Sequence, residues 1–182
     1  MNKVSTNNYF VIQVKTLAEK EFVSRVQNLF PGIKLYFPQR ILYMYKAGKT
    51  TPSLHPVFPG YVFMELDADD NANRYLMPFR KTEEFYRFLK SDKEITPLTK
   101  KDLELALRFI QRPGAIAEAS KVYFDENSRI VVLQGPLSGF EGKIVKVDRR
   151  KKRAKIALDL YDNNFFIDLA FDVIDMAERQ IA

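Results

Sequence analysis

The chain has 182 residues, of which 46% are hydrophobic and 29% charged, a composition typical of a globular rather than a disordered protein. Lys and Arg outnumber Asp and Glu by 29 to 23, and the resulting net charge of +6 favours association with polyanions such as nucleic acids. The absence of cysteine excludes disulfides, zinc fingers and iron–sulfur clusters. Because we find neither a signal-peptide core nor an apolar run long enough to span a membrane, we expect a cytoplasmic protein without membrane association.

The first third of the chain begins with a strand pattern followed by a helix pattern. Residues 9–15 are aromatic and β-branched, which predicts a buried strand. Thr16 and Glu19 have the spacing of a capping box and therefore predict the start of a helix. Pro31 and Gly32 predict its end.

A predicted hairpin with a long tip comes next. Strand patterns at 33–45 and 57–66 flank the polar, turn-forming residues 46–53, which predict a loop. A short helix is expected near residues 72–77 and a further strand near 84–89.

A last helix completes this part of the chain. Thr99 and Asp102 form a second capping box, and Pro113 with Gly114 predicts the end of the helix. The order strand, helix, strands, helix, strand, helix predicts an α+β sandwich in which helices cover an antiparallel sheet.

The pattern then changes to short strands alone, and four or five of them within about fifty residues predict a small β-barrel. These strand patterns cover residues 129–134, 142–147, 154–160 and 165–169. We therefore expect one domain at residues 1–112 and a second at 127–182, joined by a flexible linker at 113–126.

The most specific motif lies at residues 130–148. Two β segments flank a turn that contains Gly135, Gly139 and Gly142, as a tight strand reversal requires. This segment resembles the KOW motif, an element of small SH3-like barrels in ribosomal proteins and transcription elongation factors. A Walker-type phosphate loop is excluded because the spacing differs and Ile144 stands where Ser or Thr is required.

Five consecutive cations follow this motif directly. At a hairpin tip they would form a compact phosphate-binding surface. The alternative is a solvated turn whose charges serve solubility, and the residues alone favour neither. The five are Arg149, Arg150, Lys151, Lys152 and Arg153.

A second motif points to one family. Residues 57–66 resemble the "FPGY" strand of the NusG N-terminal domain, and residues 9–15 resemble the first strand of that domain. With the KOW segment and the motifs that follow it, the resemblance runs in the same order over about residues 9–175. The chain is identified as a member of the NusG family of transcription elongation and antitermination factors. The implied fold is a NusG-type α/β sandwich followed by an SH3-like KOW barrel.

The resemblance implies RNA polymerase as a partner, with the polymerase clamp helices bound in an apolar groove. The matching residues are Tyr9, Phe58, Pro59 and Tyr61. The alternative is that the aromatic residues belong to the core and that Pro59 only forms part of a turn. It also implies that Lys46, Lys49 and Arg74 face the displaced non-template DNA strand, whose phosphates attract cations.

The second domain departs from the family pattern at one turn. In the housekeeping factor an aliphatic–Phe–Gly–Arg turn contacts Rho or a small-subunit ribosomal protein. Here residues 160–165 carry Asp162 and Asn163 in place of Gly and Arg, while Tyr161 keeps a ring for a partner protein. With Asn8 in place of a Trp, the pattern resembles specialised paralogues such as the LoaP antiterminators.

Enzyme function is not expected. The chain has one histidine, His55, and no cysteine, so His-based metal sites and Cys nucleophiles lack their parts. We expect no catalytic, cofactor-binding or metal-binding residues. We predict a monomeric factor that binds RNA polymerase, suppresses pausing and acts in processive antitermination, with its barrel on nascent RNA or a partner protein. The alternative is a ribosome-associated, KOW-type RNA-binding protein.

Overall fold

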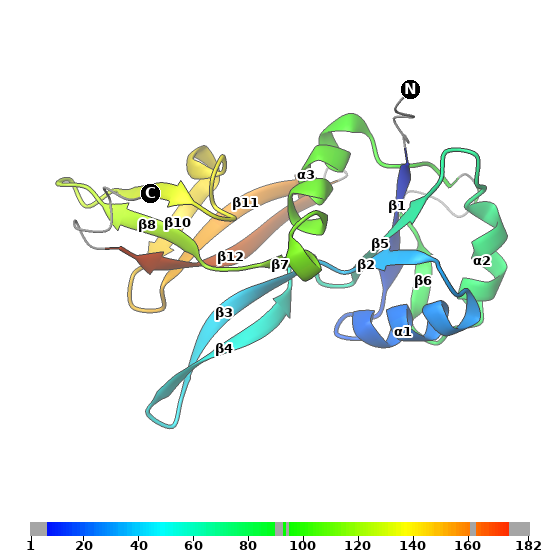
Figure 1. Ribbon diagram of the computed structural model, residues 1–182, viewed down its shortest axis with the longest axis horizontal. Coiled ribbons are helices and arrows are strands. Elements are labelled where there is room, and N and C mark those ends of the chain that lie inside the picture. The colour runs from blue at the N-terminus through cyan, green and yellow to red at the C-terminus, as the bar shows by residue number, and fades with distance from the viewer. Residues whose placement is uncertain (1–6, 90–92, 94, 161–162, 175–182) are drawn as a thin grey trace. The chain divides into compact units, whose positions relative to one another are not determined.

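The computed structural model describes residues 7–89, 93, 95–160 and 163–174, and the chain divides into two compact units (Figure 1). The first unit consists of Met1–Pro38 and Phe58–Ile110. The second consists of Gln39–Val57 and Gln111–Ala182. The chain therefore leaves the first unit at Pro38 and returns to it at Phe58.

The first unit is built on a four-stranded sheet with the order β2-β5-β1-β6, in which β1 and β5 are the central strands and every pair is antiparallel. The strands are β1 (Asn8–Val14), β2 (Lys34–Tyr36), β5 (Tyr61–Leu66) and β6 (Phe85–Phe88). The helices of this unit are α1 (Glu19–Leu29), α2 (Asn73–Arg80) and α3 (Lys100–Ile110). The expected α+β class with an antiparallel sheet is confirmed.

Both faces of the central strand β5 are buried. Val62 and Met64 belong to a core that also contains Phe22 of α1 and Phe79 of α2. Successive side chains of a strand point to opposite faces, so Phe63 lies on the other face, where it is also fully buried. This two-sided burial explains why residues 61–66 read as an almost continuous apolar run.

Helix α1 begins at Glu19, and the predicted capping box at its start is wrong. The N-cap position is Ala18, and no side chain caps the helix. Glu19 is buried and accepts a hydrogen bond from the backbone amide of Gly60 instead. A contact 41 residues away along the chain thus takes the carboxylate that the local pattern assigned to capping.

The predicted hairpin is also different. Strand β3 (Gln39–Lys46) pairs with β4 (Lys49–Pro56), so most of the expected polar loop is strand. The turn between them is short, and its two residues, Ala47 and Gly48, have φ of 50° and 77°, as a tight two-residue hairpin turn requires.

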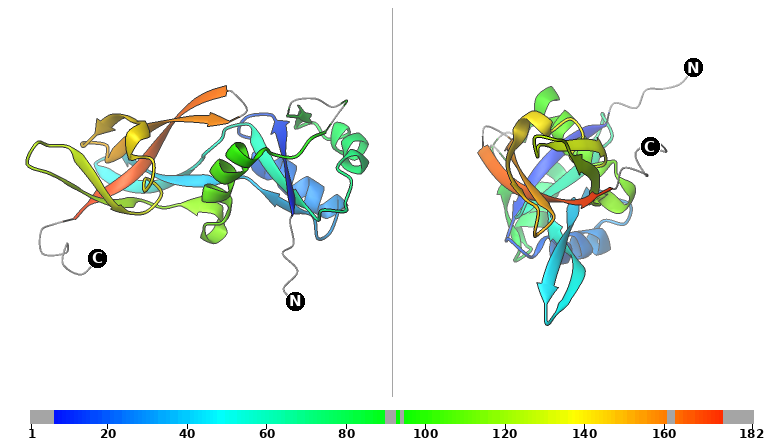
Figure 2. Two further views of the ribbon diagram at one scale, coloured as in Figure 1. Left: turned by 90° about the horizontal axis from the view of Figure 1, so that it is seen from above. Right: turned by 90° about the vertical axis from the view of Figure 1, so that its left-hand side faces the viewer.

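The second unit contains a curled five-stranded sheet with the order β10-β11-β12-β8-β9 (Figure 2). All its pairs are antiparallel except β12 with β8. The strands are β8 (Ser120–Phe124), β9 (Ile130–Gln134), β10 (Ile144–Asp148), β11 (Arg153–Leu160) and β12 (Asn163–Val173). A three-stranded sheet, β4-β3-β7, also belongs to this unit, and β3 packs against β12.

The range expected as a flexible linker contains two strands, β7 (Ile116–Ala117) and β8. Strand β7 pairs with β3, and β8 is a central strand of the five-stranded sheet. Ser120 of β8 also fixes the KOW turn, because its hydroxyl accepts a hydrogen bond from the Leu137 amide at 2.9 Å. The domain boundaries proposed from the sequence stay a prediction.

The KOW turn needs a glycine at position 135 for two reasons. Gly135 has φ of +107°, a conformation that L side chains rarely adopt. A Cβ atom there would lie 2.7 Å from the Cα atom of Ser120. Only glycine therefore allows the turn to pack this closely against β8.

Candidate functional site

The Pro59–Gly60 turn enters β5 in a fixed conformation. Gly60 has φ of +82°, and its amide donates to the Glu19 carboxylate at 2.6 Å. Its carbonyl accepts from the Val14 amide at 2.8 Å. Since Glu19 is only 3% exposed, this buried carboxylate holds the turn from the inside while Pro59 stays exposed.

Glu19→Ala is expected to destabilise the first unit by about 1–3 kcal/mol, because it leaves the Gly60 amide buried without an acceptor. Glu19→Gln keeps an acceptor oxygen and should recover most of the loss. Thermal denaturation followed by circular dichroism measures both, with exposed Glu21→Ala on the same helix as the matched control. Equal melting temperatures for Glu19→Ala and Glu21→Ala would refute the structural role of Glu19.

Phe58 does not present its ring to a partner. Its side chain is 1% exposed, and its ring lies edge-on to those of Phe63 and Phe109, with centroids 5.5 and 5.7 Å apart. The ring is therefore part of the core and not of the surface, and a place for Phe58 beside the polymerase groove stays a prediction. The ring is buried because α3 supplies Phe109 as a partner that the local motif does not show.

The other expected polymerase contacts differ in exposure. Pro59 is exposed, and Tyr9 and Tyr61 are half-buried on the central strands of the sheet. Tyr9 pairs with Glu65 across β1 and β5, and Tyr61 pairs with Gln13. Their contact with a polymerase remains a prediction.

Glu65 on β5 accepts hydrogen bonds from a cluster of polar side chains on and beside β1 and β2. Its side chain is 9% exposed and accepts from the Lys34 ammonium and the Tyr36 hydroxyl, each at 2.8 Å. Asn7 and Tyr9 donate to the same carboxylate. Burial opposes its ionisation, but these hydrogen bonds outweigh burial and lower the pKa of Glu65. Burial, together with the charge of Glu65, raises the pKa of Tyr9 to about 12.

The lowered pKa of Glu65 predicts how stability depends on pH. A carboxyl group with a folded pKa below its unfolded value stabilises the fold above the unfolded pKa and loses this effect as pH falls through the folded pKa. Glu65→Gln should therefore cost about 1–3 kcal/mol at neutral pH and little in strong acid. Melting curves between neutral pH and about pH 3 measure this. An equal cost at both ends of the range would contradict the account.

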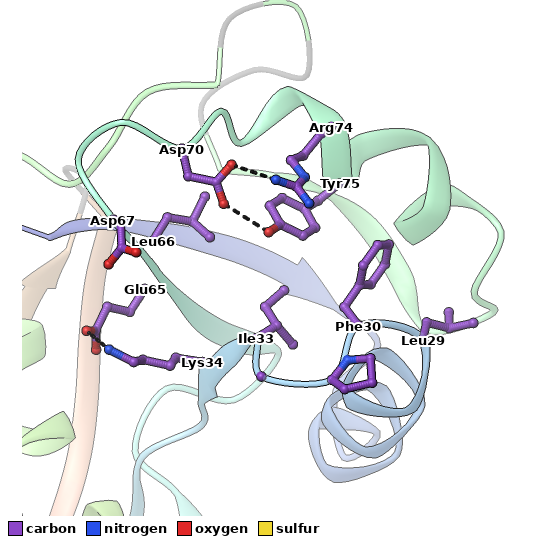
Figure 3. Close-up of a pocket in the computed structure, with 12 residues that line it drawn as sticks. Leu29, Phe30, Ile33, Lys34, Glu65, Leu66, Asp67, Asp70, Arg74 and Tyr75 are labelled. Carbon is purple, nitrogen blue, oxygen red and sulfur yellow. Dashed lines mark hydrogen bonds and ion pairs between the residues drawn. The ribbon is translucent and has the colours of Figure 1, made fainter.

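Arg74 lines a pocket of about 420 Å³ in the first unit (Figure 3). One wall is apolar and includes Phe30 and Ile33, which flank the turn after α1. The charged lining residues are three acids, Glu65, Asp67 and Asp70, and two bases, Lys34 and Arg74. The pocket thus has no excess of positive charge that would favour a phosphate group.

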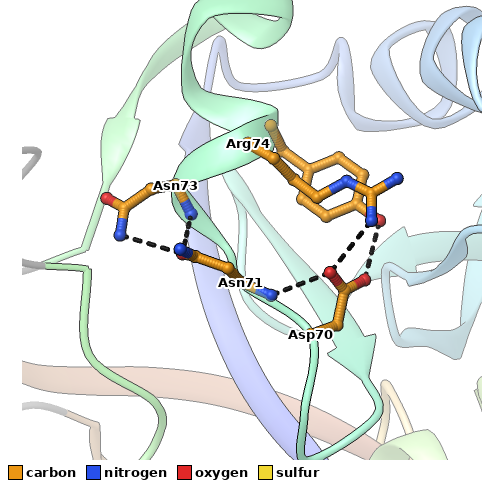
Figure 4. Close-up of polar contacts among 5 residues, drawn as sticks. Asp70, Asn71, Asn73 and Arg74 are labelled. Atoms are coloured by element: carbon orange, nitrogen blue, oxygen red, sulfur yellow. Dashed lines mark hydrogen bonds and ion pairs between the residues drawn. The ribbon is translucent and has the colours of Figure 1, made fainter.

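The Arg74 side chain is already paired. Its guanidinium lies 3.1 Å from Asp70 and 5.0 Å from the centre of the Tyr75 ring (Figure 4). Burial opposes ionisation of Asp70, but hydrogen bonds from the Asn71 amide and the Tyr75 hydroxyl, with the charge of Arg74, lower its pKa. Since the Arg74 side chain is 61% exposed, breaking such a pair costs little. Its contact with DNA stays a prediction.

The two expected DNA-binding lysines lie at the tip of the β3–β4 hairpin. Lys46 and Lys49 pair across the two strands on either side of the turn, and both side chains are exposed. The structure therefore brings these two cations together, as the sequence implied, but on paired strands rather than in a long loop.

The first four of the five cations form the tight turn between β10 and β11, and the fifth, Arg153, begins β11. Asp148 pairs with Arg153 across the strands, and its carboxylate accepts from the Lys151 amide at 2.9 Å. The Arg149 guanidinium lies 3.8 Å from the centre of the Phe124 ring. Lys152 forms an ion pair with Asp172 at 3.4 Å. The turn is thus partly anchored to its own barrel.

Arg150 and Lys151 differ from the other cations of the turn. Both are exposed, and neither side chain has a hydrogen-bond or ion-pair partner in the part of the chain that the structure describes. Arg153 is half-buried and donates to the carbonyl of Tyr43 at 2.9 Å. Arg150 and Lys151 therefore keep their full capacity for phosphate, whereas Arg153 is structural.

Tyr161, the residue expected to contact a partner protein, lies outside the described residues, as does Asp162. The sequence reading missed Tyr45, which is 75% exposed on β3 beside the tip lysines. The signal for it in the sequence was its position directly before Lys46, opposite a polar segment, which favours an exposed ring.

The described part of the chain holds no group of three or more His, Cys, Asp or Glu side chains that could bind a metal ion. Burial, reinforced by the charges of Arg40 and Arg153, lowers the pKa of His55 and keeps its imidazole neutral at pH 7. No helix within the described ranges is long and apolar enough to cross a membrane.

Comparison with known proteins decides the family. The family model described as transcription termination factor NusG matches residues 7–107, more than half of the chain, and the KOW motif matches residues 126–156. The chain belongs to the NusG family. Membership accounts for the order of a mixed α/β unit followed by a small β-barrel, and the members of this family act on the transcription machinery.

Curated relatives carry the name transcription termination/antitermination protein NusG. The Campylobacter jejuni protein is 23% identical over 179 residues, which cover 94% of this chain and 98% of the relative. The Bacillus subtilis protein is 26% identical over 130 residues, with 71% and 72% covered. These relatives support a role in transcription elongation and antitermination.

A solved structure supports the fold. A structure titled domain interaction in Thermotoga maritima NusG has a TM-score of 0.50 at 18% identity and covers 91% of this chain and 94% of that chain. At this identity the likeness concerns the fold alone.

Proposed function

We propose that this chain is an elongation factor that binds the clamp helices of RNA polymerase, suppresses pausing and supports processive antitermination. The observation that carries the proposal is the Pro59–Gly60 turn, which Glu19 holds rigidly with Pro59 exposed and Tyr61 half-buried beside it. A fixed turn that carries an exposed proline beside an aromatic side chain is suited to contact helices, because little order is lost on binding.

The factor acts by binding and not by chemistry. A ligand that binds the closed clamp more tightly than the open one shifts the polymerase towards the closed state by as much as the difference in affinity. Pausing then decreases because the open, paused state becomes less populated. Tyr9, Pro59 and Tyr61 are the proposed contacts, and Phe58 supports them from the core.

The basic residues supply contacts to nucleic acid. Lys46 and Lys49 at the hairpin tip face the non-template DNA strand, and the cations of the β10–β11 turn bind nascent RNA. Arg74 contributes less because Asp70 already pairs with it. Tyr161 contacts a partner protein, Rho or a small-subunit ribosomal protein. The protein works as a monomer in the cytoplasm, as a specialised paralogue of the LoaP type.

Binding to purified core RNA polymerase tests the proposal against the ribosomal alternative. The full chain should bind core polymerase, and Pro59→Ala combined with Tyr61→Ala should weaken this binding at least tenfold, since aromatic anchors at interfaces commonly contribute about 2 kcal/mol or more. Tyr86→Ala, an exposed tyrosine on β6, is the matched control. Binding to ribosomes without binding to polymerase would refute the proposal.

A further inference from the structure

A cleft of about 650 Å³ lies within the second unit, between the β3–β4 hairpin and the β10–β11 turn. Its two walls differ in chemistry. The hairpin wall is aromatic and apolar, and the turn wall is cationic. The hairpin contributes Tyr43, Met44, Tyr45 and Thr50, and the turn contributes Arg150, Lys151, Lys152 and Arg153.

Four of these residues hold the two walls together. The Tyr43 hydroxyl donates to the Asp172 carboxylate at 3.1 Å, and the Lys152 ammonium lies 3.4 Å from the same carboxylate. The Arg153 guanidinium donates to the Tyr43 carbonyl at 2.9 Å and lies 3.2 Å from the Met44 sulfur. These contacts engage the Tyr43 hydroxyl, the Lys152 ammonium and one amino group of Arg153, so they give the cleft its shape, while the Lys152 side chain stays 53% exposed.

The remaining lining groups are free to meet a ligand. Tyr45 is 75% exposed, and Thr50 pairs with it on β4. Arg150 and Lys151, on the opposite wall, have exposed side chains without partners among the described residues. The cleft therefore presents an accessible aromatic ring across from two unneutralised cations.

This combination fits single-stranded nucleic acid. Unpaired bases stack on aromatic rings, and the adjacent phosphates bind cations, in proteins that hold single strands. In a duplex the bases stack on one another and their faces are not accessible to a tyrosine ring. An acidic peptide would use Arg150 and Lys151 but would leave the Tyr45 ring without a matching partner. The cleft volume is in the range that encloses a small organic ligand, which corresponds to one or two nucleotides.

We propose that this cleft binds a single nucleic-acid strand, with a base stacked on Tyr45 and the neighbouring phosphates on Arg150 and Lys151. The inference rests on the proposed function, because it takes nucleic acid as the ligand of the basic turn. It adds that the hairpin and the turn hold one strand between them and that Tyr45 is a binding residue.

Fluorescence anisotropy with the full chain tests this inference. The probes are unstructured eight-nucleotide oligouridylate and oligodeoxythymidylate, and a duplex of the same length. Both single strands should bind more tightly than the duplex. Tyr45→Ala should weaken single-strand binding about 5- to 150-fold, as the loss of one stacked base predicts, and Tyr45→Phe should keep it. Tyr86→Ala, another exposed tyrosine that does not line the cleft, should have no effect.

The salt dependence separates the two walls. Arg150→Ala with Lys151→Ala should reduce the slope of log affinity against log salt by about 0.7 for each phosphate that is no longer neutralised. Tyr45→Ala should leave the slope unchanged, because stacking releases no counterions.

The relative affinities of the two single strands identify the natural ligand. Tighter binding of oligouridylate indicates nascent RNA, and tighter binding of oligodeoxythymidylate indicates the non-template DNA. Either preference supports the cleft.

Four results would overturn the inference. If Tyr45→Ala binds like the unaltered chain while the Arg150/Lys151 variant loses affinity, the basic turn binds RNA without the cleft, and the proposed function stands. Equal affinity for single strands and duplex would also exclude a base-stacking cleft. So would complete displacement of the bound oligonucleotide by polyglutamate of equal charge. If the chain binds neither strand but still binds core polymerase, both the cleft and the nucleic-acid role of the turn fail.

Discussion

Phe58→Ala is expected to lower the free energy of unfolding of the first unit by about 3–5 kcal/mol, the usual cost of truncating a buried phenylalanine. The ring is 1% exposed and lies between Phe63 and Phe109, so its removal leaves a cavity where β5 meets α3. Chemical denaturation followed by circular dichroism measures the loss. Phe58→Leu should retain more stability, because it fills more of the cavity.

Two measurements distinguish this core role from direct contact with a partner. Exposed Tyr86→Ala serves as the control for loss of an aromatic ring and should leave stability unchanged. If Phe58→Ala keeps the stability of the unaltered chain but no longer binds core polymerase, then Phe58 is a surface contact, as the sequence alone suggested.

Removing cations from the β10–β11 turn is expected to have the largest functional effect. Arg149→Ala, Arg150→Ala and Lys152→Ala together should abolish antitermination. They should also flatten the salt dependence of binding to a structured RNA, by about one unit of log–log slope for each phosphate that is left without its cation. Arg149 also packs on Phe124, and Lys152 pairs with Asp172, so most of the change should come from Arg150.

The matched control removes the same charge elsewhere. Lys20, Lys81 and Lys100 are exposed cations of the first unit, and their replacement by alanine lowers the net charge equally. RNA affinity measured over a range of salt concentrations should change little for this variant. Equal losses in the two triple variants would show that net charge alone, and not the turn, attracts RNA. A barrel that binds Rho tightly but binds no RNA even at low salt would indicate a conventional housekeeping factor.

Local sequence patterns predicted the strands that are mostly apolar or that flank a glycine-rich turn. Residues 9–15 are aromatic and β-branched and lie largely on a buried central strand, and the KOW segment combines two β segments with a glycine-rich turn, so both could be predicted from the sequence. The polar residues 46–53, which include Pro52, are predicted as a loop, but residues 49–56 form strand β4. In the described part of the chain β4 is an edge strand paired with β3, and a missing backbone N–H is tolerated there.

The candidate site was less predictable because distant contacts determine it. Glu19 holds Gly60, and Phe109 covers Phe58, and neither partner is visible in the motif around residues 57–61. The division of the β10–β11 turn into free and anchored cations likewise depends on Asp172 and Tyr43, which are far away in the sequence. The motifs therefore predicted a turn and a basic run as candidate sites, but not which of their side chains have partners within the chain.

The most direct test of the central claim is the lifetime of a paused RNA polymerase on a defined template, measured with and without the full chain. If the chain binds the clamp helices and favours the closed state, the pause half-life should shorten with added protein and saturate. The Pro59→Ala/Tyr61→Ala variant should require a higher concentration for the same effect, and Tyr86→Ala should match the unaltered chain. An unchanged pause half-life at concentrations that saturate polymerase binding would contradict the account.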